Sequence, residues 1–317
     1  MTEEQLSFKE DKIVKILNTV YELLKKGNFK EAYFQLESVL KIDFEYPGIP
    51  EALKSTKYWI EHLKDYELIE DKFQRGEYLL TTWNAYNDFI LQSGPIPDFV
   101  FYNTKQFIFS TALKNYKASL DAVNRYNPTI LLQLGRSYKA VGNYEYAIQL
   151  LENANQINPG NSTILAELAD CYSLIDELRA SKLFFREAFF INPREVNLAT
   201  LESPIIVKLV ERLKRKGYNK KELAEWIPVY GNIWNVFNVK RELKPLEIGK
   251  LKQSIFTLEQ EVKEENKNLA ILMPKLLNHY FWLIDHYVST HEDRDRIEEI
   301  LEKIKNINET IYVEYTK

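Results

Sequence analysis

The chain has 317 residues, of which 45% are hydrophobic and 28% are charged, and its net charge at pH 7 is −4. This charge excludes a global attraction to nucleic acid, and a single cysteine excludes an internal disulfide. Only 10 glycines and no sustained strand-like alternation favour an all-α fold.

The first predicted element is a helical hairpin over residues 13–44. Gly27 and Asn28 interrupt its helical pattern, and both residue types tolerate the left-handed backbone that ends a helix. The acidic, polar N-terminus shows no apolar run of the kind found in a secretory signal or a membrane span. We therefore expect a cytoplasmic protein, or a periplasmic one if a leader has been removed.

The next stretches continue the helical periodicity with weaker hairpin signals. Residues 51–91 have the length of a hairpin, and Arg75–Tyr78 is its predicted turn. Residues 96–126 are helical in period, and prolines recur at roughly one hairpin's spacing. We therefore predict degenerate helical hairpins over residues 6–127.

A repeat then begins, because Pro128–Pro159 can be superposed on Ser162–Pro193 at an offset of 34 residues (162 minus 128). Each copy reads as two helices, broken at Gly142 in the first copy and at Asp176 in the second. The matching pairs are Leu131 and Leu165, Leu134 and Leu168, Gly135 and Ala169, Tyr138 and Tyr172, Ala154 and Ala188, and Pro159 and Pro193.

These residues resemble the tetratricopeptide-repeat family, and the chain is similar to bacterial members of it. The resemblance implies two well-formed units over residues 128–195 in a helical-hairpin solenoid. It also implies a non-enzymatic adaptor or scaffold that binds a peptide or helix of another protein in its concave groove. The family positions are occupied in order by Leu131, Leu134, Gly135, Tyr138, Gly142, Tyr144, Ala147, Leu151, Ala154 and Pro159.

The resemblance also implies which side chains line that groove. In this family the first helix of each repeat faces the concave surface through the positions that flank its packing residues. The lysine and asparagine pair with which some members hold a C-terminal carboxylate is missing from this sequence. The implied partner-binding residues are Thr129, Leu132, Gln133, Arg136 and Lys139 in the first copy, and Thr163, Ala166, Glu167, Asp170 and Ser173 in the second.

After the repeats the pattern of apolar and aromatic residues changes. Residues 196–240 are predicted to form a degenerate hairpin and the aromatic segment Trp226–Phe237, and residues 241–317 to form long C-terminal helices. Apolar residues from Leu251 to Leu276 follow a heptad rhythm interrupted by Glu265, which favours one long helix packed on the last repeats over a coiled coil.

The aromatic segment has two interpretations. Trp226, Tyr230 and Trp234 recur at helical spacing, which indicates burial against the last repeat. Exposed, they would instead be partner-binding residues. The alternative function is a structural subunit, for example of a flagellar-motor collar, that docks or forms homo-oligomers through this segment and the C-terminal helices.

Nothing in the sequence favours catalysis, a cofactor, a metal or membrane insertion. His279 and His286 lie two helical turns apart, about 10 Å, which is too far to share a metal. Cys171 lies among packing positions and is predicted to be an inert buried thiol. The basic run from Lys208 to Lys221 is either a solvated helix end or a surface for an acidic or phosphate-bearing partner.

Overall fold

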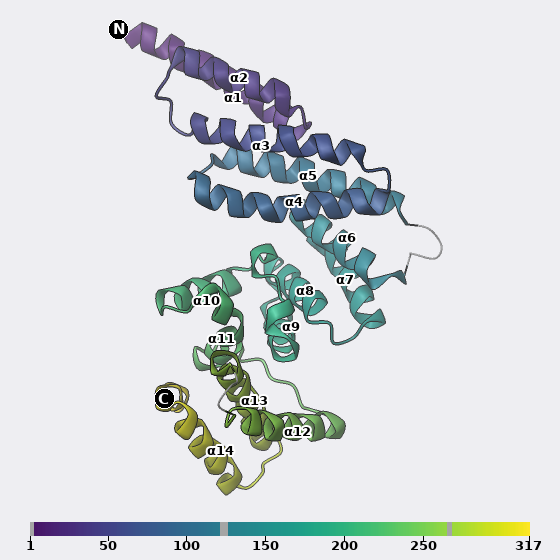
Figure 1. Ribbon diagram of the computed structural model, residues 1–317, viewed down its shortest axis with the longest axis vertical. Helices are drawn as coiled ribbons and strands as arrows, with labels where there is room; N and C mark the ends of the chain where they lie inside the picture. Colours follow the sequence, from purple (N-terminus) through teal and green to yellow (C-terminus); the bar gives the residue numbers. More distant parts are fainter. Residues whose placement is uncertain (1–2, 121–125, 265–267) are drawn as a thin grey trace. The chain divides into compact units, whose positions relative to one another are not determined.

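The computed structural model describes residues 3–120, 126–264 and 268–317. These residues form helices and turns, with no strand among them, so the all-α prediction is confirmed (Figure 1). The chain divides into two compact units, residues 1–150 and 151–317. Each unit has its own hydrophobic core.

Parts of three predictions lie outside the described residues. They are residues 121–125 in the predicted helical stretch 96–126, the heptad interruption at Glu265, and the side chains of Lys220 and Lys221 in the basic run.

The first unit begins with a hairpin of two helices in contact, at the place where the sequence pattern indicates one. Its turn contains Gly27, whose φ is +81°. A Cβ at this position would lie 2.1 Å from Cε2 of the Phe107 ring, so the turn requires glycine for backbone conformation and for space. The helices of this unit are α1 (Glu3–Lys25), α2 (Phe29–Ile42), α3 (Ile49–Leu68), α4 (Lys72–Ser93), α5 (Asp98–Ala118), α6 (Pro128–Ala140) and the first half of α7 (Tyr144–Ile157).

The predicted turn at Arg75–Tyr78 is wrong. The chain turns earlier, where the Asp71 carboxylate caps α4 by accepting a hydrogen bond from the Gln74 amide at 2.7 Å. Gly76 lies inside α4, and a Cβ there would lie 2.5 Å from the Tyr116 ring. Gly76 therefore permits close packing of α4 on α5 and does not end a helix.

The connectivity of the first unit departs from a simple succession of hairpins. Helix α5 contacts α1 as well as its neighbours α4 and α6. The Phe29 and Phe107 rings meet edge to face, with centroids 5.6 Å apart. Thus α5 closes the unit by packing on the helices with which the chain began.

Replacing Gly27 with alanine is expected to lower the free energy of unfolding by about 2–3 kcal/mol, because the substitution adds left-handed strain and a clash with Phe107. Gly142→Ala is the matched control. Gly142 also has a left-handed φ, +85°, but no atom lies within 4 Å of its added Cβ. Urea denaturation followed by circular dichroism measures both losses, and equal losses would contradict the packing argument.

Both repeat hairpins form as predicted. Gly142 separates α6 from α7, and the family packing positions Leu134, Ala147 and Ala154 are buried. In the second copy Asp176 takes the left-handed turn, with a φ of +64°. The two units divide within α7, after Leu150.

The second unit continues with the hairpin of α8 (Ser162–Leu174) and α9 (Leu178–Ile191). The predicted degenerate hairpin also forms, with its turn at Gly217. The single long helix predicted across the heptad stretch is wrong, because two helices in mutual contact, α12 and α13, replace it. The remaining elements are η2 (Pro193–Glu195), η3 (Leu198–Thr200), α10 (Pro204–Arg215), α11 (Lys220–Ile233), α12 (Pro245–Glu261), α13 (Leu269–Ser289), α14 (Arg294–Ile307) and α15 (Glu309–Tyr315).

Helix α13 is central to this unit. It contacts α11, α12 and α14, and residues from several of its faces are buried, including Leu277, Tyr280 and Phe281. A helix buried on most of its faces belongs to a core. This explains why α13 has more apolar residues than a helix that buries only one heptad face.

Candidate partner-binding surfaces

The groove residues predicted on α6 are only partly accessible. Thr129 is exposed, and Leu132, Gln133 and Arg136 are half-buried. Lys139 is 3% exposed. The accessible part of the predicted face is therefore the first two turns of the helix.

The groove residues predicted on α8 are covered by the chain itself. The segment that follows α9, residues 193–203, lies on them. Thr163 donates to the Glu195 carbonyl at 3.0 Å, and the Thr200 hydroxyl donates to Glu167 Oε1 at 2.7 Å. Thr163 is half-buried and Glu167 is 1% exposed.

Asp170 anchors the same covering segment. Its carboxylate accepts backbone hydrogen bonds from Glu202 at 3.0 Å and from Ser203 at 2.7 Å. The Ser173 hydroxyl accepts a 2.7 Å hydrogen bond from the Ser203 hydroxyl, and Ala166 is buried. Residues 193–203 thus occupy the part of α8 that the resemblance assigned to a partner.

The aromatic segment packs inside the second unit. Trp226 and Tyr230 are buried, at 8% and 3% exposure, and Trp234 is half-buried. The Tyr230 hydroxyl hydrogen-bonds the Tyr218 hydroxyl at 3.0 Å. Of the two interpretations of this segment, burial is therefore the correct one for Trp226 and Tyr230.

His279 of α13 is a core residue. His279 is buried, and its Nδ1 lies 2.8 Å from the Lys275 carbonyl. Burial lowers the pKa of His279 to about 4, so the ring is neutral near pH 7. Asp285 pairs with Arg186 and Lys240 instead. In the described part of the chain, no group of three or more His, Cys, Asp or Glu side chains is placed to hold a metal ion.

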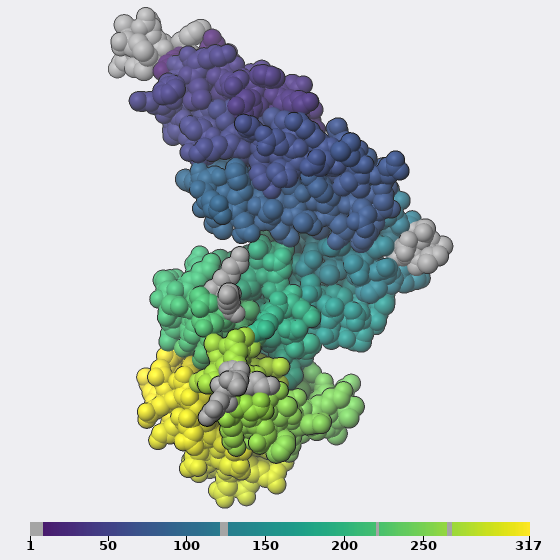
Figure 2. Space-filling model, in the orientation of Figure 1, coloured from purple at the N-terminus to yellow at the C-terminus, as the bar shows by residue number. Residues whose placement is uncertain are grey.

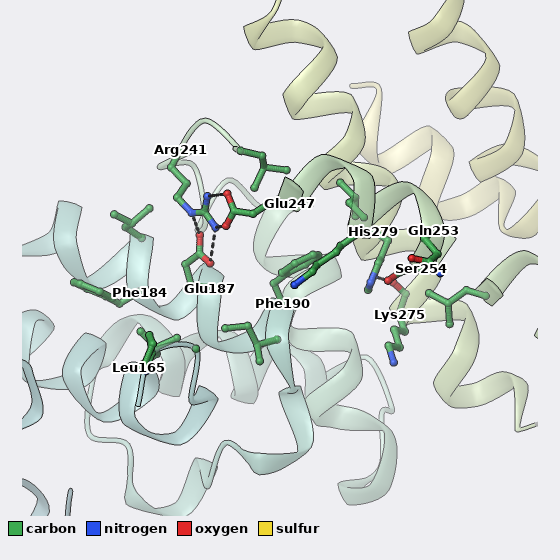
Figure 3. A pocket seen from close by; sticks show the side chains of 18 of the residues that line it. Leu165, Phe184, Glu187, Phe190, Arg241, Glu247, Gln253, Ser254, Lys275 and His279 are labelled. Atoms are coloured by element: carbon green, nitrogen blue, oxygen red, sulfur yellow. Dashed lines mark hydrogen bonds and ion pairs between the residues drawn. The ribbon is translucent and has the colours of Figure 1, made fainter. Parts of the chain in front are cut away.

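An open cleft of about 880 Å³ lies between α9 and α12 in the second unit, and α13 closes one end of it (Figure 3). Phe184 and Phe190 line it from α9, and Leu251 and Leu258 line it from α12. Phe190 is fixed against the α13 residue Trp282, with ring centroids 4.3 Å apart. The cleft therefore has firm apolar walls contributed by separate elements.

One arginine joins the two walls. Arg241 forms a bidentate ion pair with Glu247 of α12, at 2.8 and 2.9 Å, and also pairs with Glu187 of α9 (Figure 3). Hydrogen bonding from Arg241 lowers the pKa of Glu247 to about 2, so this bridge stays ionised at neutral pH. The bridge holds the width of the cleft at this end.

The charges that line the cleft balance. Three basic residues stand against three acidic ones, so the lining has no net charge. This lining offers apolar contact and shape, and no net charge, to a molecule that enters the cleft. The basic residues are Arg241, Lys250 and Lys275, and the acidic ones are Glu187, Glu247 and Glu261.

Sequence reasoning missed this cleft because α9 and α12 are far apart in the chain. A signal was present in Phe190, which falls outside the packing positions of the repeat, whereas Phe184 stacks on Tyr172 inside the hairpin. The α12 residues that face them, Leu251 and Leu258, belong to a heptad pattern, which indicates helix packing and does not indicate a cleft.

Comparison with known proteins supports the assignment of the repeats. The tetratricopeptide-repeat family model matches residues 138–202, from the end of α6 to the loop before α10. No curated protein matches the chain. No helix in the described ranges combines the length and apolarity needed to cross a membrane.

Proposed function

We propose that the chain is a non-enzymatic adaptor that binds an apolar peptide segment of a partner protein, because its residues 138–202 match the tetratricopeptide-repeat family model. The binding site in this proposal is the cleft between α9 and α12. The observation that carries it is the open apolar surface of Phe184 and Phe190, which lies directly on the second helix of the matched repeat.

The dimensions and lining of the cleft support a peptide ligand. A volume near 880 Å³ falls within the roughly 300–1,000 Å³ range of ordinary ligand sites, and several apolar side chains of one segment fit in it. Hydrophilic side chains of the lining, among them Gln253, Ser254 and Thr257, offer hydrogen bonds to a peptide backbone.

The proposal places the ligand away from the groove implied by the resemblance. Glu167, Asp170 and Ser173 are buried under residues 193–203, so a partner would have to displace that segment to reach them. The alternative of assembly through the aromatic segment receives no support from Trp226 and Tyr230, whose side chains are buried in their own unit.

Ser254→Trp is expected to block the cleft, because Ser254 is half-buried in its wall and an indole there fills the space that a ligand needs. Peptides selected on the full-length protein from a random display library should be rich in Leu, Ile and Phe. Their affinity should fall at least ~tenfold for Ser254→Trp, about 1.4 kcal/mol of binding free energy.

Ser254→Ala is the matched control and should bind the selected peptides like the original protein. Isothermal titration calorimetry measures all three affinities, and circular dichroism verifies that the variants are folded. Selection of charged peptides only, or equal affinity for the Trp variant, would remove the cleft as the binding site.

A further inference from the structure

The outer face of α10 presents a row of basic side chains. Lys208, Arg212 and Arg215 follow one another at i, i+4 and i+7, and all three are exposed. The opposite face, with Ile206 and Leu213, is buried. Figure 2 shows α10, in green, at the surface of the second unit.

These charges are not neutralised locally. Between Pro204 and Gly217 the chain has five basic residues and a single acidic one, Glu211. Lys216 forms an ion pair with Glu314 at 2.9 Å. Within the described ranges the other four basic side chains form no ion pair; they are Lys208, Arg212, Lys214 and Arg215.

The helix dipole explains only part of this charge. Cations in the last turn of a helix stabilise its C-terminus, and Arg212, Lys214 and Arg215 lie there. Lys208 lies one turn earlier, beyond the reach of that effect. The row therefore extends further along α10 than stabilisation of the helix requires.

Arg212 is held in a conformation suited to binding an anion. Its guanidinium carbon lies 3.7 Å from the centroid of the Trp234 ring. Trp234 in turn packs on Tyr230, with ring centroids 4.7 Å apart. A guanidinium stacked by its face keeps its N–H edge free for bidentate contact with a carboxylate, and it loses little side-chain entropy on binding.

We propose that the outer face of α10, together with Trp234, docks a Glu- and Asp-rich segment of a partner protein. The three basic residues of the row span about 10 Å along the helix. Carboxylates on successive turns of a partner helix span a similar distance. This surface is distinct from the α9–α12 cleft, because no residue of α10 lines the cleft.

Charge and composition favour an acidic protein segment over other anions. A nucleic acid carries negative charge along its whole backbone and would meet the chain's net charge of −4 beyond the basic row, whereas a short acidic segment contacts the row alone. Glu211, inside the basic row, disfavours a dense array of phosphates. Val207 is the only large apolar side chain of α10 that is exposed, at 40%, so the helix offers little apolar surface to a lipid bilayer.

The test uses the full-length protein and a fluorescently labelled Ala-rich helical peptide with Glu on every helical turn. Fluorescence anisotropy should report saturable binding at about 0.1 M salt and its loss at about 1 M, where the Debye length falls from ~10 to ~3 Å. Lys208→Glu/Arg212→Glu/Arg215→Glu should weaken binding at least ~tenfold. The charge-matched control Lys54→Glu/Lys57→Glu/Lys64→Glu, at exposed positions of α3, should bind normally.

Two further variants separate this surface from general electrostatics and from the cleft. Arg212→Lys keeps the charge but removes the planar fork, and it should bind severalfold more weakly. Ser254→Trp should bind the acidic peptide normally, even if the cleft proposal fails. The inference is overturned if the α3 variant loses as much affinity as the α10 variant, if no salt-sensitive binding occurs, or if oligouridylate or phosphatidylserine vesicles bind this face more tightly than the peptide.

Discussion

Asp285→Ala is expected to lower the free energy of unfolding by about 3–5 kcal/mol, which makes it one of the most damaging single substitutions in the second unit. The Asp285 carboxylate pairs with Arg186 of α9 and Lys240. Arg186 is only 2% exposed, and its guanidinium lies over the Trp282 ring at 4.3 Å. Without Asp285 this buried charge would have no counterion, and burying an unpaired charge is expensive.

A second variant separates the free-energy cost of the unpaired charge from the net contribution of the ion pair to stability. Arg186→Met/Asp285→Leu removes both charges, and it should recover most of the stability that Asp285→Ala loses. Glu298→Ala is the control, because it breaks the exposed pair with Arg294 and should cost less than about 1 kcal/mol. Urea denaturation measures all of them, and similar losses for Asp285→Ala and Glu298→Ala would contradict the argument.

Asp170→Ala is expected to release the segment that covers α8. The carboxylate accepts the amide protons of Glu202 and Ser203, and each hydrogen bond to a charged group contributes about 1.5–3 kcal/mol. We therefore expect a loss of roughly 3–6 kcal/mol, together with faster hydrogen exchange at these two amides. Hydrogen exchange read by NMR or mass spectrometry locates the change.

The matched control is Thr163→Val on the same helix, which removes one neutral hydrogen bond, to the Glu195 carbonyl. It should cost about 0.5–1.5 kcal/mol and leave the Glu202 and Ser203 amides protected. Unchanged protection of these amides in Asp170→Ala would show that other contacts hold the segment. It would then also show that the α8 face is closed for a different reason.

Local signals predicted the helices and their ends well. Gly27, Gly142 and Gly217 each adopt the left-handed conformation that the turn chemistry requires, and Asp176 substitutes for glycine in the second repeat. Gly76 failed as a turn signal because close packing against Tyr116 also requires glycine, and sequence does not distinguish the two causes. The packing positions of the repeats were predictable because their spacing is fixed within each hairpin.

The surfaces were less predictable because they depend on contacts between distant segments. The repeat pattern places Glu167 and Asp170 on a partner-binding face, but residues 193–203 fold back on them and cover them. The cleft depends on α9 and α12, joined by the Arg241 bridge, and periodicity carries no information about that pairing. Basic residues of α10, by contrast, were visible in the sequence, and the structure added the Trp234 ring beneath Arg212.

The return of α5 onto α1 in the first unit has a consequence for synthesis. In a simple array, each hairpin completes its packing when the next one emerges from the ribosome. Here the first hairpin lacks the Phe107 ring against Gly27 and Phe29 until α5 has been translated. Helices α1 to α5 should therefore fold late and all at once, and removing either α1 or α5 should unfold them instead of shortening the unit.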